Sequence, residues 1–175
     1  MNWSQPKVYA VKHKDEEIRA ASRSGGIFTA VSDFVLERDG VVYGCVLTDD
    51  FHAIHVRTDS RDGRNQMRGS KYIQSKMGDT YKKVQKDLDA KREVLFSGTS
   101  CQIAGLKHFL GKDYDNLTCI DIVCHGVPSP VVWISTLDGR NIRIMEKLLR
   151  LTLEIRRISD GESILKPFGL IMEKM

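Results

Sequence analysis

The amino-acid sequence predicts an α/β fold with a mixed sheet that contains a βαβ unit and is divided into two lobes. Three observations lead to this prediction. Over the first 130 residues, short β-branched segments alternate with segments of helical periodicity. Residues 93–123 read as strand, loop, helix and strand, the order of a parallel βαβ unit. Residues 41–47 and 52–58 read as two strands that form an antiparallel hairpin around Asp49-Asp50.

The remaining elements follow from local patterns of apolar residues and turn signals. Residues 8–11 are short and apolar, which favours a strand. Helices are expected at 27–38, 79–91 and 101–110, where apolar residues recur at helical spacing beside glycine or aspartate. Asp62-Gly63 is typical of a turn, and residues 71–74 favour a short strand.

Composition limits the function classes. The chain has 175 residues, 41% of them apolar and 29% charged, which suits a packed domain of ordinary size. No apolar run approaches the roughly 20 residues of a membrane span, and no export signal opens the chain, so we expect a cytoplasmic protein. The net charge of +4 is mild and its signs are interspersed, which argues against nucleic-acid binding.

Four cysteines occur at positions 45, 101, 119 and 124. In a cytoplasmic protein they are expected as free thiols. None forms a Cys-x-x-Cys pair, so a zinc ribbon and a complete ferredoxin motif are absent from this sequence. Cys45 and Cys119 lie within apolar strand patterns and are expected in the core. The histidines His13, His52 and His55 are expected on the surface or in strands.

Ser24-Gly25-Gly26 precedes the first long helical pattern. Helix N-termini present unpaired N–H groups, and glycines let a phosphate approach the backbone. The alternative is a plain turn in which Ser24 caps the helix.

Arg68-Gly69-Ser70-Lys71-Tyr72 combines two cations, a hydroxyl and an aromatic ring beside a glycine. Such a segment suits a phosphate, and Tyr72 can stack on a ring system. The alternative is an exposed basic turn.

A third loop joins a strand to a helix at Gly98 and Thr99 and places Cys101 at the helix N-terminus, where a thiolate is stabilised. Cys124 follows the next strand, and parallel strands end at the same edge of a sheet. Two thiolates there form half of an iron–sulfur site, since a four-iron cluster takes four. The alternatives are two buried cysteines, or a hydrolase in which Cys101 is the nucleophile and His108 or His125 the base.

Taken together, these segments resemble one family, the beta subunit of coenzyme F420 hydrogenases and dehydrogenases. The resemblance covers about residues 8–133. It rests on five stretches in their order and spacing: Ser24-Gly25-Gly26-Ile27-Phe28-Thr29-Ala30, Gly40-Val41-Val42-Tyr43-Gly44, Arg68-Gly69-Ser70-Lys71-Tyr72-Ile73-Gln74-Ser75, Leu95-Phe96-Ser97-Gly98-Thr99-Ser100-Cys101-Gln102-Ile103-Ala104-Gly105-Leu106 and Cys124-His125-Gly126-Val127-Pro128-Ser129-Pro130.

The resemblance implies an electron-transfer oxidoreductase that passes electrons between a 4Fe-4S cluster, FAD and a partner, which in some members is coenzyme F420. The partner on the electron path would be a ferredoxin-like domain or another redox subunit. Cys101 and Cys124 would be cluster ligands. The cofactor-binding residues would be Ser24, Gly25, Gly26, Arg68, Gly69, Ser70, Lys71, Tyr72, Gly98 and Thr99.

Departures from the family pattern imply an incomplete family domain. Ser100 stands where members usually have proline, and both the ferredoxin-like segment and the cysteine-bearing C-terminal half are missing. We therefore divide the chain into a flavin-binding lobe at 1–91, the start of the C-terminal domain at 92–133, and an atypical tail at 134–175. The alternative function is a non-catalytic truncated remnant, or a partner-binding fragment without a cofactor.

The tail carries many Ile, Leu and Arg residues with no turn signals. We interpret it as a frameshifted reading of the family's continuation. A one-base shift of the codon frame allows residues 151–156 to encode Ile or Asn followed by Phe-Arg-Asp-Lys, as the family has there. The sequence of the coding DNA tests this interpretation.

Overall fold

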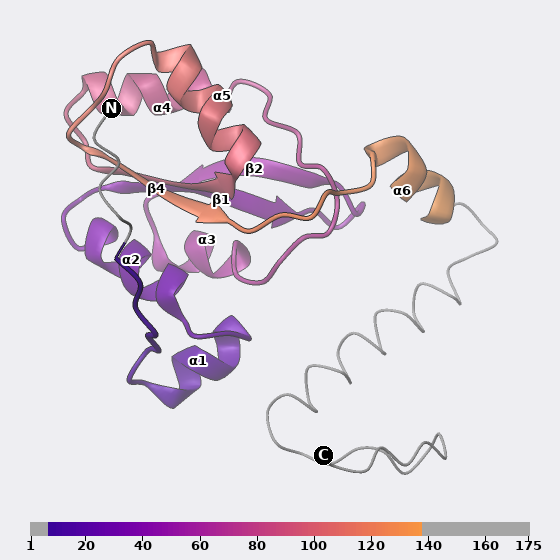
Figure 1. Cartoon of the computed structure of the whole chain (residues 1–175), viewed down its shortest axis with the longest axis horizontal. Helices are drawn as coiled ribbons and strands as arrows, with labels where there is room; N and C mark the ends of the chain where they lie inside the picture. Colours follow the sequence, from indigo (N-terminus) through magenta and orange to yellow (C-terminus); the bar gives the residue numbers. More distant parts are fainter. Residues whose placement is uncertain (1–6, 138–175) are drawn as a thin grey trace. The chain divides into compact units, whose positions relative to one another are not determined.

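This computed structural model describes residues 7–137. They belong to two units, and the boundary between the units in the sequence follows Pro128. The first unit holds a four-stranded sheet with helices on its two faces, and the second is described only through one helix (Figure 1). The elements are α1 (Glu16–Ser22), α2 (Ile27–Leu36), β1 (Val41–Leu47), β2 (Ala53–Thr58), α3 (Arg61–Gln66), α4 (Thr80–Asp89), β3 (Val94–Thr99), α5 (Ser100–Leu110), β4 (Leu117–Ile122) and α6 (Pro130–Leu137).

The sheet has the strand order β2-β1-β3-β4 and is mixed. β1 and β2 are antiparallel, with Leu47 opposite Ala53. β1 and β3 run parallel, as do β3 and β4. The expected α/β fold, the mixed sheet, the hairpin and the βαβ unit β3-α5-β4 are confirmed. β1 and β2 come from the expected first lobe and β3 and β4 from the second, and the division at residue 91 stays a prediction.

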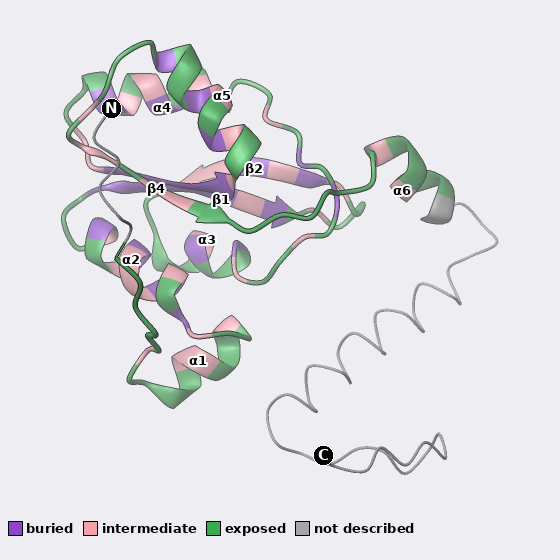
Figure 2. Cartoon of the chain, viewed as in Figure 1, coloured by how far each residue is buried: buried purple, intermediate pink, exposed green. Residues whose placement is uncertain are grey.

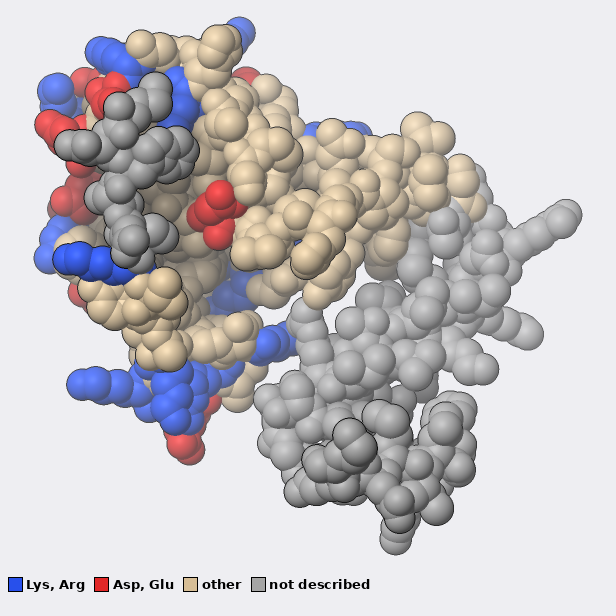
Figure 3. All heavy atoms as spheres, in the orientation of Figure 1, with Lys and Arg blue, Asp and Glu red and all other residues tan. Residues whose placement is uncertain are grey.

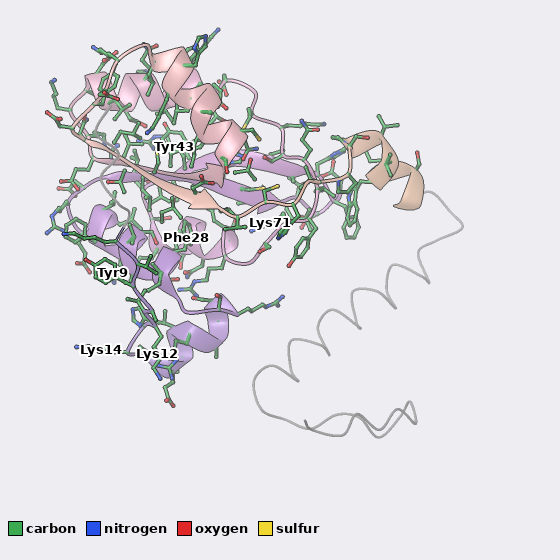
Figure 4. All side chains as sticks on the ribbon, viewed as in Figure 1. Tyr9, Lys12, Lys14, Phe28, Tyr43 and Lys71 are labelled. Carbon is green, nitrogen blue, oxygen red and sulfur yellow. The ribbon has the colours of Figure 1, made fainter. Side chains whose placement is uncertain are left out.

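Two hydrophobic clusters cover the two faces of the sheet, because successive side chains of a strand point to opposite sides. Val41 and Tyr43 of β1 pack with α4 and α5, whereas Val42 and Val46 pack with α2 and α3. Phe28 packs on the second cluster, so Tyr43 and Phe28 lie on opposite sides of the sheet (Figure 4). Figure 2 shows β1 mostly buried and β4 partly exposed.

The segment before α2 differs from the expectation. Residues 8–11 form no strand, and Val8, Tyr9 and Val11 are all exposed. A short helix, α1, follows them and was not predicted. Asp15 caps α1 by accepting from the N–H groups of residues 17 and 18, although α1 buries none of its side chains. Because no apolar face is buried, the helical periodicity that sequence reasoning relies on is missing.

Two further local predictions were wrong. Asp62 and Gly63 lie inside α3, because the Ser60 hydroxyl accepts from the Gly63 N–H and caps the helix. Residues 71–74 form no strand, and only Lys76 makes an isolated bridge, to Ile54 of β2.

The cysteines expected in the core are half-buried: Cys45 in β1 and Cys119 in β4 are both of intermediate exposure. In the second unit, α6 starts at Pro130, and residues 138–175 of the predicted atypical tail lie outside the described residues. Over residues 7–137, no helix is both long and apolar enough to cross a bilayer.

Candidate functional site

The turn before α2 is shaped by two glycines and by the chain that lies against them. Gly26 is the N-cap of α2 with φ of 78°, and no side chain caps this helix end, so the alternative of Ser24 as cap does not hold. A Cβ on Gly26 would lie 2.8 Å from the Cβ of His13. The His13 N–H donates to the Gly25 carbonyl over 2.7 Å. Because the two glycines have no Cβ, the segment around His13 can pack against one side of the turn.

Arg68 joins this turn from the far end of α3. Its Nε donates to the Thr29 hydroxyl over 3.2 Å, and the Ser22 hydroxyl lies 3.1 Å from the same oxygen. The terminal nitrogens of Arg68 have no hydrogen-bond partner within residues 7–137. Two of the loops singled out from the sequence are thus brought together, with a guanidinium beside the positive end of α2. This arrangement suits an anion.

Lys71 has a more specific position than its sequence predicts. Its ammonium donates to three main-chain carbonyls at the end of α3, those of residues 66, 67 and 68, at 3.2, 2.8 and 3.0 Å. Burial lowers the pKa of Lys71, and the nearby Cys45 thiol acts in the opposite direction. Lys71 is therefore a cap for α3, and a phosphate would compete with these carbonyls for it.

Gly69, Ser70 and Tyr72 lie on the surface beside Lys71. Gly69 has φ of 79° with open space around it, and Tyr72 is 62% exposed. Stacking of Tyr72 on a planar ligand stays a prediction.

Cys101 and Cys124 lie at one edge of the sheet. The last residue pair between the parallel strands β3 and β4 is Thr99 with Ile122, and each cysteine follows two residues later. Both thiols are exposed. The Thr99 hydroxyl lies 3.2 Å from the Cys101 sulfur, and the Gly126 N–H donates to the Cys124 sulfur over 3.3 Å. The expected placement at a shared strand edge is confirmed.

The first turn of α5 is held by its own side chains. The Thr99 N–H donates to Oε1 of Gln102 over 3.0 Å, which is one half of a capping box. A Cβ on Gly98 would lie 3.0 Å from that Oε1 and from the Phe96 ring. Because Gly98 has no Cβ, the Gln102 side chain can reach the Thr99 N–H and cap the helix. This contact within the chain is a reason for a glycine at position 98.

Three polar residues that sequence reasoning did not select lie behind this turn. Ser75 Oγ is 2.8 Å from His55 Nδ1 and 2.8 Å from Gln102 Nε2, and His55 Nε2 is 3.1 Å from the Ser97 carbonyl. His55 lies in the strand β2, one of the two places expected for it, and is buried there, and burial lowers its pKa. The sequence pattern did not indicate this burial, because the alternation of His55 with Ile54 and Val56 predicts that His55 lies on the solvated face of the strand.

Burial affects the two half-buried thiols, Cys45 and Cys119. Burial raises the pKa of Cys45, while Lys71 and the Ser75 hydroxyl act to lower it. Burial likewise raises the pKa of Cys119. Raised thiol pKa values suit core cysteines rather than nucleophiles.

The hydrolase alternative finds no geometric support. Within residues 7–137 the Cys101 sulfur has Thr99 as its hydrogen-bond partner and no histidine. The same residues contain no group of three or more histidine, cysteine or acidic side chains placed to hold a metal ion. Two cysteines alone are therefore the candidate metal ligands.

The comparisons with known proteins agree with the sequence resemblance. Residues 91–163 match the family described as the C terminus of the coenzyme F420 hydrogenase/dehydrogenase beta subunit. The resemblance to this family is thus confirmed for a partial segment. The match continues past residue 133, where the sequence resemblance was expected to end, into residues outside the described part. Curated proteins give no match.

A solved structure is also similar. It is a chain from the F420-reducing [NiFe] hydrogenase complex of Methanosarcina barkeri, solved as a xenon derivative, with a TM-score of 0.57 and 18% sequence identity. The likeness covers 75% of this chain and 50% of that one. At this identity the likeness shows the fold, and the chain spans about half the length of the chain it matches.

Proposed function

We propose that the chain is part of a cytoplasmic electron-transfer oxidoreductase subunit that binds FAD and contributes ligands to an iron–sulfur cluster. The observation that carries the proposal is the register of β3 and β4, which places Cys101 and Cys124 two residues past the same strand pair. The family match over residues 91–163 contains both cysteines and supports the proposal.

The donor set fits part of a cluster. Thiolates are the usual ligands of iron–sulfur clusters, and a four-iron cluster takes four of them. Cys101 and Cys124 are exposed and would supply two, so the other two come from a partner, a ferredoxin-like domain or another redox subunit. The cluster would supply one-electron transfer.

The turn before α2 fits the diphosphate of FAD. The N–H groups of the first turn of α2, which no side chain caps, would donate to the diphosphate, and Arg68, whose Nε donates to Thr29, would add a positive charge. Ser24, Gly25 and Gly26 would line this end, and Tyr72 would stack on a ring. FAD would supply hydride and single-electron chemistry, with the family's coenzyme F420 as one partner substrate.

A competing proposal keeps the same fold without a cofactor, as a remnant or partner-binding fragment. Lys71 favours this alternative in one respect, since its ammonium is already engaged by three carbonyls. Cofactor binding separates the two proposals directly.

The test is anaerobic reconstitution of the purified chain with FAD, iron, sulfide and an excess of a small-molecule thiol that supplies the two remaining ligands, followed by measurement of bound flavin, bound iron and the visible spectrum. We expect Cys101→Ser and Cys124→Ser to lose bound iron, and Cys119→Ser, the half-buried control, to retain it. Arg68→Gln should weaken FAD binding more than Arg61→Gln, which removes an exposed charge from the neighbouring helix. Equal iron in all three cysteine variants, or no FAD binding by the chain, would contradict the proposal.

A further inference from the structure

A chain of hydrogen bonds runs from β2 to the first turn of α5 through three side chains that lie far apart in the sequence. Gln102 contacts Ser75, Ser75 contacts His55, and the other ring nitrogen of His55 contacts the Ser97 carbonyl of β3. His55 and Ser75 are buried at 8% and 9% exposure. Buried polar atoms of this kind are costly unless each has a partner, and here each has one.

Chemistry fixes the direction of every bond in the chain. The Ser97 carbonyl can only accept, so the proton of neutral His55 is on Nε2, and Nδ1 accepts from the Ser75 hydroxyl. The Ser75 oxygen then accepts from Nε2 of Gln102, whose Oε1 accepts from the Thr99 N–H. One tautomer and one rotamer satisfy all four bonds.

The surroundings keep His55 neutral. Its ring stacks on Phe96 with centroids 5.5 Å apart, and the charged group that acts on it is Lys71, which opposes a second positive charge. Cys45, the other titratable group near Ser75, has a raised pKa and is a neutral thiol. From the α4 side, the Tyr81 hydroxyl donates to the Gln102 carbonyl and Thr80 to the His55 carbonyl.

We propose that His55 and Ser75 are positioning residues for the Cys101 thiol. They hold Gln102, the neighbour of Cys101 in the first turn of α5, against β2 and the segment before α4. Gln102 is thereby fixed at both ends of its amide, and the turn that presents the Cys101 sulfur has one orientation. The functional value of this orientation rests on the proposed role of Cys101 as a cluster ligand.

The first test measures thiol reactivity in the apo chain, so it does not depend on cofactor binding. Ser75→Ala removes the donor to His55 and the acceptor for Gln102. We expect iodoacetamide to alkylate Cys101 about fivefold faster, the factor that corresponds to about 1 kcal/mol, the typical worth of one hydrogen bond. Cys124, measured in the same digest by mass spectrometry, should keep its rate.

The matched control is Ser32→Ala, which removes another buried hydroxyl, from α2 and away from α5. It should leave the Cys101 rate unchanged. An unchanged rate in Ser75→Ala, or the same increase in Ser32→Ala, would overturn the proposal.

The second test uses NMR of the imidazole nitrogens to find which nitrogen of His55 carries the proton. We call the chain of hydrogen bonds through His55, Ser75 and Gln102 the His55 relay. In the unaltered chain the His55 proton should lie on Nε2, with a pKa below the ordinary 6.5. Gln102→Glu keeps the acceptor for the Thr99 N–H but replaces the donor to Ser75 by an acceptor. The Ser75 hydroxyl then donates to the introduced carboxylate and no longer to Nδ1 of His55. A protonated Nδ1 can donate to the Ser75 oxygen, so the charged form of His55 is stabilised and its pKa should rise.

A proton on Nδ1 in the unaltered chain, or a His55 pKa that does not change in Gln102→Glu, would contradict the proposed direction of these hydrogen bonds. If the chain binds no iron on reconstitution while both tests succeed, the proposed function fails and the positioning role of His55 and Ser75 on Cys101 stands.

Discussion

Two glycines with nearly the same backbone conformation have different reasons to be glycine. Gly26 has φ of 78° and Gly69 has φ of 79°, yet a Cβ on Gly26 would press on His13, whereas Gly69 has open space around it. A side chain in this left-handed region costs about 1 kcal/mol by itself. The packing of residues 11–13 against the turn adds a second cost at Gly26 only.

We therefore predict that Gly69→Ala lowers the free energy of unfolding by about 1 kcal/mol, and that Gly26→Ala lowers it by at least about 1 kcal/mol more. The extra cost is the displacement of the His13 segment. Urea unfolding followed by circular dichroism measures both. Equal losses would mean that the N-terminal segment yields freely, and that it does not shape the turn.

At the level of single residues, sequence reasoning identified groups whose chemistry is local. Cys101, Cys124 and Arg68 were selected because each lies in a short loop that contains a glycine, a pattern visible in a few consecutive residues, and their roles stay predictions. His55, Ser75 and Gln102 were missed, because their bonds join residues 20 and 27 positions apart. Such bonds are set by the sheet register, which no short pattern contains.

At the level of elements, α3 shows tertiary contacts overriding local preference. Its six residues include Asp62 and Gly63, which favour a turn. The helix is held by Arg64, which is 2% exposed and donates to the Thr29 carbonyl, the Ser32 hydroxyl and Asp33 of α2. A helix this short is not stable alone, so contacts of this kind determine whether it forms.

Two arginines of α3 share Asp33 and form a matched pair. Arg64 and Arg61 both contact Oδ1 of Asp33, but Arg61 is 61% exposed. We predict that Arg64→Ala lowers the free energy of unfolding by about 3 kcal/mol, since it leaves buried acceptors unpaired. Arg61→Ala should cost less than about 1 kcal/mol, as exposed ion pairs do.

Equilibrium urea titration of the two variants makes this comparison. Losses of the same size would show that α3 is held by its charge on Asp33 and not by the buried bonds to Thr29 and Ser32. The strand β1, by contrast, was predicted with the bounds that it has, because its apolar run is long and α1 has no such run.

At the scale of the whole molecule, the pairing of β1 with β3 was not predicted from the sequence. The hairpin and the βαβ unit were each predicted from neighbouring segments, but their joining into one sheet puts residues 41 and 94 side by side. That joining also brings the ends of β1, β3 and β4 to one edge, since all three run parallel. The thiols, the α5 cap and the His55 relay share a location for this reason.

The same sheet leaves β4 with β3 as its only strand neighbour within residues 7–137. Thr118, Asp121 and Ile122 are exposed on it, and Asp121 is its one charged residue. On the face seen in Figure 3, Lys, Arg, Asp and Glu gather mostly along one side, and uncharged residues make up much of the rest. An edge strand with few charges pairs readily with other chains. We predict concentration-dependent self-association of the purified chain, measured by light scattering.

Thr118→Lys should reduce this association, because a lysine on an edge strand opposes strand pairing. Ala104→Lys, on an exposed position of α5, adds the same charge away from the edge and is the control. If β4 is the site of association, the apparent mass at high concentration falls in Thr118→Lys and stays the same in Ala104→Lys. Equal decreases would instead assign the association to net charge, and the open edge of β4 would have no part in it.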